Sequence, residues 1–176
     1  SAASDVYKRQ EKGKEEAIRI IETTELKNDR VLVVYLPDCH ESLAGIIAGR
    51  IREKYHRPAF VLTGGETSAK GSGRSIESYS MYEELVKCAD LMIQFGGHPM
   101  AAGLSIEEKN IEEFRRRLNV NCTLTDEELR PKIVIDVPMP VSYITKELVE
   151  QISLLEPFGK GNTKPVFAQK NLRVLD

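Results

Sequence analysis

Two apolar runs on either side of an amphipathic segment constrain the fold of this chain more than any other feature. The first run, RVLVVYLP, spans residues 30–37, and the second, PAFVLTGG, spans residues 58–65. Both have strand length and lack polar alternation, which is typical of strands buried on both faces of a sheet. Apolar residues recur between them at helical spacing, at Leu43, Ile46, Ile47 and Ile51. Residues 30–63 therefore predict a right-handed strand–helix–strand unit with parallel strands.

The segments that follow add an antiparallel strand and two helices to this unit. Residues 68–76, SAKGSGRSI, predict the antiparallel partner strand, and AAGLSI at 101–106 predicts another strand. Ser80 and Glu83 form an S-x-x-E capping box that opens a helix over residues 81–92. A later helix carries apolar residues at Ile111, Phe114 and Leu118. The fold class is α/β, with a mixed sheet and flanking helices. Gly45 and Gly49 are expected to let the helix before residue 58 approach the sheet closely.

The remaining segments give the domain organisation. Residues 1–29 are expected to form a leader or linker helix, although SAASDVYKRQ at 1–10 has no helical or strand periodicity and is set aside as a non-native candidate. Residues 30–125 form the α/β domain. Residues 130–176 begin a β-rich domain, in which alternating apolar residues at 130–140 predict a half-buried strand. One helix and two or three strands cannot close a barrel, so we expect the chain to be truncated at its C-terminus.

Composition and charge exclude several classes of protein. The chain is 41% hydrophobic and 30% charged, which fits a globular domain, and no window of the sequence is apolar enough to span a membrane. The net charge of −2 argues against a surface that coats DNA generally. Positive charge clusters in RIREKYHR (50–57) and FRRRLN (114–119), which are more typical of solvated helix faces than of binding sites. The three cysteines match no zinc or disulfide spacing and indicate reduced packing residues in a cytoplasmic protein.

Common catalytic motifs are absent from the sequence. His40 and Glu41 begin an H-E-x-x-H pattern that fails at Ala44, and Gly71 follows Lys70 where a phosphate loop needs a glycine before the lysine. No G-x-S-x-G elbow and no aspartate–histidine cluster of a two-metal site occurs. The chain therefore carries no complete catalytic constellation and no metal site of its own.

Two glycine-rich segments retain a chemical interpretation. In KGSGRS (70–75), glycines allow backbone N–H groups to point at an anion, the serines add hydroxyl donors, and Arg74 supplies a planar fork for phosphate oxygens. The structural alternative is a glycine-rich strand edge with a solvated Arg74. GGHPMAAG (96–103) is interpreted as a ligand-contacting loop, since paired glycines permit close approach and His98 presents an imidazole. A lone histidine is more often structural or superficial.

These segments carry a resemblance to a known family. AKGSGRSIESYSMYEEL, followed by FGGHPMAAGLSIEE, closely resembles the DHH-associated domain of the RecJ family of single-strand-specific exonucleases in the DHH phosphoesterase superfamily. LPDCHESLAGIIAGRIREKYHRPAFVL is similar to the strand–helix–strand that opens that domain. LEPFGKGNTKPVFA (155–168) is similar to the family's entry into an oligonucleotide-binding (OB) type barrel. The resemblance spans roughly residues 30–176 and rests on four motifs in the family's order.

The resemblance implies a function and a set of site residues. RecJ enzymes degrade single-stranded DNA from the 5′ end in DNA repair and recombination, with Mn²⁺ or Mg²⁺ held by a preceding DHH domain. This chain would be the substrate-binding C-terminal portion, binding no metal and inactive alone. Ser72, Gly73, Arg74 and Ser75 would contact DNA phosphates, and Gly96 would also belong to the substrate-binding set. Gly97 and His98 would face the metal site and steady the scissile phosphate. Single-stranded DNA would be the substrate, and a helicase or single-strand-binding protein would be a compatible partner.

Departures from the family and two alternatives stay open. Where the family often has a Trp-His pair and a following glycine, this chain has Cys39, His40 and Ser42, so His40 is not assigned a role. Arg50 is a weaker phosphate candidate. One alternative is a metal-free module for single-stranded nucleic acid, although 6% aromatic residues and no Trp offer few stacking partners. The other is a related phosphodiesterase of nano-RNA or cyclic dinucleotides, which the barrel-like segment after residue 130 disfavours.

Overall fold

The strand–helix–strand unit predicted from the two apolar runs is confirmed. In the computed structural model, which describes residues 2–173, it consists of β1 (Leu32–Leu36), α2 (Ala44–Tyr55) and β2 (Ala59–Thr63). β1 and β2 are parallel, and Leu32 is paired with Ala59. Every residue of β2 is buried, as its uninterrupted apolar run predicts.

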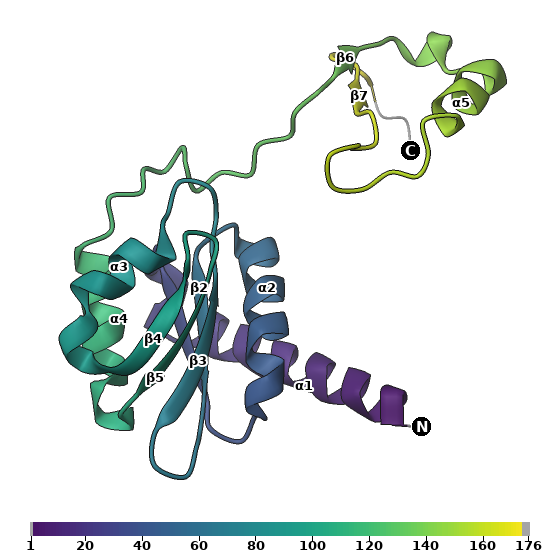
Figure 1. Ribbon diagram of the computed structural model, residues 1–176. Coiled ribbons are helices and arrows are strands. Elements are labelled where there is room, and N and C mark those ends of the chain that lie inside the picture. Colours follow the sequence, from purple (N-terminus) through teal and green to yellow (C-terminus); the bar gives the residue numbers. More distant parts are fainter. Residues whose placement is uncertain (1, 174–176) are drawn as a thin grey trace. The chain divides into compact units, whose positions relative to one another are not determined.

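Three further strands extend this pair into one five-stranded mixed sheet (Figure 1). They are β3 (Ala69–Arg74), β4 (Met92–His98) and β5 (Ala101–Ile106). The strand order is β1-β2-β3-β5-β4, and every neighbouring pair after β1 and β2 is antiparallel. The α/β class with a mixed sheet and flanking helices is therefore confirmed, and the glycine-rich β3 is an internal strand.

Helices cover the two faces of the sheet unequally. One side carries α1 (Ala2–Thr23) and α2, and the other carries α3 (Met81–Lys87) and α4 (Ile111–Val120), as Figure 1 shows. Each side has its own buried cluster, with Phe60 and Phe114 in one and Ile21 and Ile51 in the other. α1 packs against β1, and α2 packs against β2 and β3, so the faces of β4 and β5 on that side carry no such cover. Short 3₁₀ turns occupy Glu25–Asn28, Glu41–Leu43, Ala89–Leu91 and Glu108–Asn110.

The first helix is longer than the sequence indicates. Residues 2–10, which show no periodicity, belong to α1. Their apolar side chains Val6 and Tyr7 are 46% and 61% exposed, so these residues pack on no core that would impose a periodic pattern. The buried contacts of α1 come from Ala17 and Ile21 in its second half.

The helix after the capping box is shorter than expected. Ser80 accepts the hydrogen bond from the Glu83 N–H, as the S-x-x-E pattern predicts, but α3 ends at Lys87 instead of residue 92. Residues 89–91 form a 3₁₀ turn, and Met92 already begins β4. The apolar residues near 91–95 therefore belong to an edge strand and not to the end of a helix.

Residues 132–176 form a second compact unit, separate from residues 1–131. Its elements are α5 (Lys146–Ser153), a 3₁₀ turn at Val141–Tyr143, and the short parallel strands β6 (Val137–Pro138) and β7 (Phe167–Ala168). The strand predicted over 130–140 is thus reduced to two residues. None of the described residues 132–173 is buried, so no core holds a longer strand in place.

Candidate nucleic-acid interface

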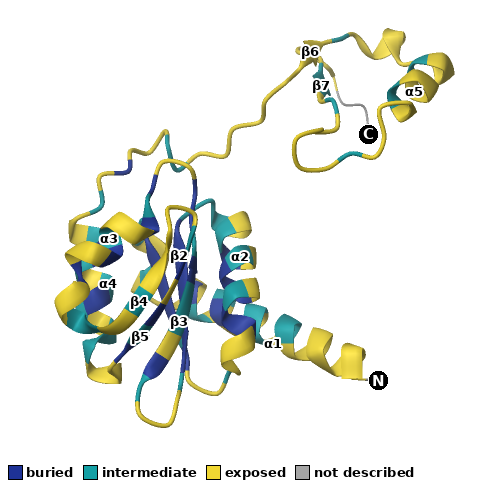
Figure 2. Ribbon diagram, in the orientation of Figure 1, coloured by how far each residue is buried: buried dark blue, intermediate teal, exposed yellow. Residues whose placement is uncertain are grey.

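On the side of the sheet that carries α2, the surface from β3 across β5 to β4 is lined by polar and small residues and is called here the open face. Strand registers place its residues in three rows, each running from β3 across β5 to β4. The rows are Lys70, Ser105 and Gln94; Ser72, Gly103 and Gly96; and Arg74, Ala101 and His98. Figure 2 shows β4 as largely exposed, in contrast to the buried β2. The open face therefore joins residues of the two glycine-rich segments that the sequence singled out.

Alternation along β3 decides which of its residues reach the open face. Lys70, Ser72 and Arg74 lie on it, while Gly71 and Gly73 face the opposite, buried side. A Cβ at Gly73 would stand 2.6 Å from the Met81 sulfur and 2.7 Å from the Phe60 ring. Gly73 is thus a packing residue, required because the core comes too close for a side chain.

The internal position of β3 corrects the expected phosphate cradle. Backbone N–H groups in KGSGRS were expected to point at an anion. Instead, β3 pairs with β2 along one edge and with β5 along the other. An internal strand commits its backbone N–H and C=O groups to both ladders. The groups of β3 that remain free to meet an anion are therefore side chains, those of Ser72 and Arg74 among them.

Ser75 lies outside the open face. It is fully buried, and its hydroxyl lies 2.6 Å from the Tyr79 carbonyl oxygen and 3.2 Å from that of Ile76. The hydroxyl is therefore used to close the turn that follows β3. The expected phosphate contact of Ser75 does not fit this environment, because a buried, hydrogen-bonded hydroxyl cannot meet a strand of DNA on the surface.

The glycine-histidine segment is a hairpin and not a loop. Gly96, Gly97 and His98 end β4, and Ala101 already begins β5, which leaves Pro99 and Met100 at the turn. The small residues after the turn belong to a strand whose other face is buried. The expected exposure of His98 is present, since its side chain lies at the end of an edge strand.

The two adjacent glycines have different roles. Gly97 has φ +146°, and a Cβ there would stand 2.6 Å from Ala102 Cα, so the hairpin itself requires glycine. A Cβ at Gly96 would meet nothing within 4 Å. Gly96 lies beside Gly103 in the register, where the nearest atom to an added Cβ is 3.8 Å away. Packing within the described chain therefore accounts for Gly97 but not for Gly96.

Arg74 and His98 lie at the two ends of one row, with Ala101 between them. Their backbones are two strands apart, about 10 Å, because neighbouring strands are spaced by roughly 4.8 Å. Arg74 Nη1 donates to the Gly73 carbonyl at 2.8 Å, and no carboxylate among residues 2–173 forms an ion pair with it. No described residue hydrogen-bonds the His98 ring. Both side chains are thus available to a ligand on the open face.

A groove of about 330 Å³ adjoins the open face beside the start of α2. Its lining includes Ser42, Lys70 and Ser72. Lys70 forms an ion pair with Glu41 at 2.8 Å. This hydrogen bond is the main cause that lowers the pKa of Glu41 and raises the pKa of Lys70 from their ordinary values. The lysine charge is therefore already balanced, and Arg74 remains the less neutralised cation of β3.

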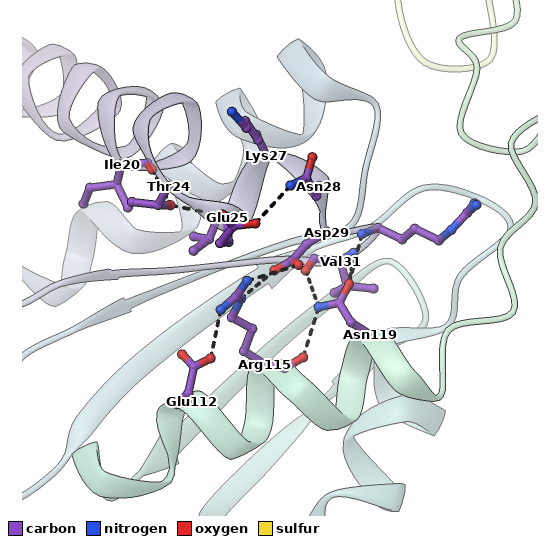
Figure 3. Close-up of polar contacts among 12 residues, drawn as sticks. Ile20, Thr24, Glu25, Lys27, Asn28, Asp29, Val31, Glu112, Arg115 and Asn119 are labelled. Carbon is purple, nitrogen blue, oxygen red and sulfur yellow. Dashed lines mark hydrogen bonds and ion pairs between the residues drawn. The ribbon is translucent and has the colours of Figure 1, made fainter.

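The basic clusters elsewhere serve the fold. In α4, Arg115 donates to Asp29 at 2.6 Å and to Glu112 at 2.8 Å, as Figure 3 shows. Arg116 and Arg117 both donate to Glu113. These bonds confirm that FRRRLN is a helix face engaged in ion pairs. Two other candidates also have local partners. Arg50 donates to Glu53 at 3.3 Å, and His40 accepts from the Ser42 N–H as the cap of the turn before α2.

Three members of the open face were missed from sequence. Gln94, Gly103 and Ser105 complete its rows. A signal for Gly103 and Ser105 was available, because they alternate with the buried residues Ala102, Leu104 and Ile106. Gln94 could not be placed in this way, since a register irregularity lies between Met92 and Gln94.

The described residues do not fit a divalent metal site. Within residues 2–173, no three His, Cys, Asp or Glu side chains come together as candidate ligands. The carboxylates near the open face, such as Glu41, are engaged with lysine instead. None of the helices in the described part is long and apolar enough to cross a bilayer. The three cysteines are free, and Cys88 is buried in a core, which confirms packing roles.

The five-stranded mixed sheet, with its open face beside α2, defines the chain as an α/β domain with a polar sheet surface. The model of the DHHA1 domain family matches residues 28–123, more than half of the chain, and the chain belongs to this family. The model of the RecJ OB domain matches residues 135–176. The family resemblance inferred from the glycine-rich segments is thereby confirmed.

Curated and solved relatives agree with this assignment. The chain is 37% identical over 155 residues to the single-stranded-DNA-specific exonuclease RecJ of Bacillus subtilis, covering 86% of this chain and 20% of that protein. It is 35% identical over 162 residues to RecJ of Escherichia coli, covering 86% and 28%. The crystal structure of RecJ in complex with Mg²⁺ from Thermus thermophilus has a TM-score of 0.76 and 28% identity, covering 90% of this chain and 25% of that one. The chain thus spans only between a fifth and just over a quarter of the length of these relatives.

Proposed function

We propose that this chain is the substrate-binding portion of a 5′–3′ single-stranded-DNA exonuclease of DNA repair and recombination. Residues 30–125 would hold the substrate on the open face, and residues 130–176 would begin an OB-like nucleic-acid-binding domain. Hydrolysis of the phosphodiester would need Mn²⁺ or Mg²⁺ held by a separate DHH domain, so this chain alone would not cleave DNA. The proposal also places the protein in the cytoplasm, where a helicase or single-strand-binding protein could supply the substrate.

The observation that carries this proposal is the row of Arg74, Ala101 and His98 beside the row of Ser72, Gly103 and Gly96. A guanidinium without a carboxylate partner is suited to phosphate oxygens, which it can bind with two N–H donors at once. Gly103 and Gly96 carry no side chains that would stand above the sheet, so a DNA backbone could approach it closely there. The names of the relatives support single-stranded DNA as the ligand.

Each exposed group has one task in this proposal. Arg74 would bind phosphate oxygens through its planar fork, and Ser72 would donate its hydroxyl to a neighbouring phosphate. His98 would donate a ring N–H to the scissile phosphate at the end of the β4 edge strand. Gly96 would admit the strand, while Gly73 and Gly97 would support this surface through packing alone.

Binding of a fluorescein-labelled oligothymidylate, followed by anisotropy at several salt concentrations, tests the proposal. We expect salt-dependent binding by the unmodified chain and no cleavage of the oligonucleotide with Mn²⁺. Arg74→Ala should weaken affinity about tenfold, as expected for loss of a charge-assisted hydrogen bond, and should lower the salt slope by about 0.7. His98→Ala should weaken it less. Both variants should melt within about 1 °C of the unmodified chain, because surface changes away from structural contacts cost little.

Three results would contradict the proposal. Cleavage by this chain alone would show that it carries its own catalytic centre. Unchanged binding in Arg74→Ala and His98→Ala, with a large loss of stability, would assign both side chains to the fold. Tight binding with no gain of cleavage after fusion to a DHH domain would favour the metal-free binding module instead.

A further inference from the structure

Gly45, on the α2 face nearest the open face, lies directly against the Arg74 side chain. A Cβ at Gly45 would stand 2.6 Å from Arg74 Nη2, 3.4 Å from Cζ and 3.7 Å from Nη1. The three atoms nearest to this Cβ all belong to the guanidinium, and none belongs to the backbone of the sheet. Gly45 therefore gives room to the charged end of one side chain.

This contact corrects the expectation that Gly45 and Gly49 bring the helix close to the sheet. The helix instead packs through the buried residues Ala44, Ile47, Ala48 and Ile51. A Cβ at Gly49 would meet nothing within 4 Å. A glycine inside a helix weakens it relative to alanine, so packing of α2 gives no reason for either glycine.

The same guanidinium is held from a second side. Arg74 Nη1 donates to the Gly73 carbonyl oxygen at 2.8 Å, next to Arg74 in β3. The surface of Gly45 and this carbonyl together restrict where the planar group can lie. Most of its N–H donors remain free for a ligand, since an arginine has five. A fork held in one place loses less conformational freedom when it binds.

We propose that Gly45 is a positioning residue, which seats the Arg74 guanidinium against α2 so that its free N–H groups are preorganised for phosphate. This inference rests on the proposed function of Arg74 as a phosphate-binding group. The place of the guanidinium against Gly45 is called here the seat. Any side chain at position 45 would occupy the seat and force the guanidinium to move. The helix itself would tolerate the change, because the contacted atoms are the far end of a flexible side chain.

Two matched substitutions in one helix test the seat. Gly45→Ala and Gly49→Ala should both leave the melting temperature unchanged or raise it, since each replaces a helical glycine with the best helix former. Only Gly45→Ala should weaken binding of the labelled oligothymidylate, by about three- to tenfold, within the range for a charge-assisted hydrogen bond. Gly49→Ala should bind as the unmodified chain does.

The position of the guanidinium can be followed without a ligand. The NMR signal of the Arg74 Nε–H should shift in Gly45→Ala and stay in place in Gly49→Ala. In an Arg74→Ala background, Gly45→Ala should have no further effect on binding, because its action passes through that side chain. A full additional loss in that background, or an unmoved Arg74 signal, would overturn the seat.

The outcomes separate this inference from the function on which it rests. If Arg74→Ala binds normally, the proposed phosphate contact fails, whatever Gly45→Ala does. If Arg74→Ala weakens binding but Gly45→Ala and Gly49→Ala both bind normally, only the seat fails. Equal losses in both glycine variants would assign the effect to α2 as a whole and would also overturn the seat.

Discussion

The adjacent glycines Gly96 and Gly97 differ in whether the fold itself requires glycine at their positions. Gly97 is fixed by φ +146° and by its contact with Ala102, whereas an added Cβ at Gly96 meets nothing within 4 Å. On an exposed strand, alanine is not inferior to glycine for the fold. The described part of the folded chain therefore makes no use of the space above Gly96.

We predict that Gly96→Ala keeps or slightly raises the thermal stability while weakening oligothymidylate binding. The added methyl group would occupy a part of the open face that otherwise carries no side chain. Gly97→Ala should instead destabilise the chain by about 1–3 kcal/mol, as expected for strained backbone in a non-glycine residue. Melting curves and anisotropy titrations of the two variants measure both effects. Normal binding by Gly96→Ala would show that no ligand approaches this row.

The burial of Ser75 indicates a structural role, whereas the family resemblance implies a phosphate contact, and a substitution distinguishes the two roles. Its hydroxyl is fully buried and within 2.6 Å of the Tyr79 carbonyl oxygen. Ser75→Ala should cost about 1–3 kcal/mol of stability, since a buried hydrogen bond is lost and a carbonyl loses its donor. Binding per folded molecule should be unchanged. A variant of native stability with impaired binding would restore Ser75 to the phosphate-contacting set.

At the scale of elements, one side chain fastens the outer edge of β1 to α4. Asn119 Oδ1 accepts from the N–H groups of Arg30 and Val31 at 2.9 and 3.0 Å. Its Nδ2 donates to the carbonyl oxygens of Val31 and Arg115, both at 3.0 Å (Figure 3). β1 is an edge strand, and an unpaired edge exposes backbone groups to pairing with other chains. Asn119 replaces the missing neighbour at the start of the strand.

Asn119→Ala should therefore lower the free energy of unfolding by about 2–4 kcal/mol, because Val31 is fully buried and its N–H would lose its acceptor. Chemical denaturation followed by circular dichroism measures this loss. Asn121→Ala is the matched control, since Asn121 is an exposed residue just after the same helix. Equal midpoints for the two variants would refute the role of Asn119 at the strand edge.

Elements with strong hydrophobic contrast were predictable from sequence, and so were the strands β3 and β5, whereas β4 was not. The apolar runs of β1 and β2 predicted their burial and parallel pairing. In β4, Gly96 and Gly97 contribute no apolar contrast, so this end of the hairpin was interpreted as a loop. The same limit applies to the site. Arg74 and His98 were identified by residue type, but their common row and the burial of Ser75 depend on register.

At the scale of the whole molecule, the two units differ in what can hold them folded. Residues 1–131 contain both buried clusters, whereas none of the described residues 132–173 is buried. Several large apolar side chains of the second unit are exposed, including Ile133 at 77% and Leu154 at 83%. Hydrophobic burial is the dominant favourable term in folding, so stability should reside in the first unit.

We predict that residues 1–131, produced alone, melt within about 2 °C of the whole chain, because both buried clusters consist of residues of the first unit. Amide hydrogen exchange should show directly in which unit the stability resides. Amides of the internal strand β2 should be protected up to the global free energy of unfolding, while those of 132–173 should exchange almost as in an unfolded peptide. Strong protection in the second unit would show that its exposed apolar residues are covered in solution. Loss of the thermal transition in residues 1–131 would show that the first unit depends on the second.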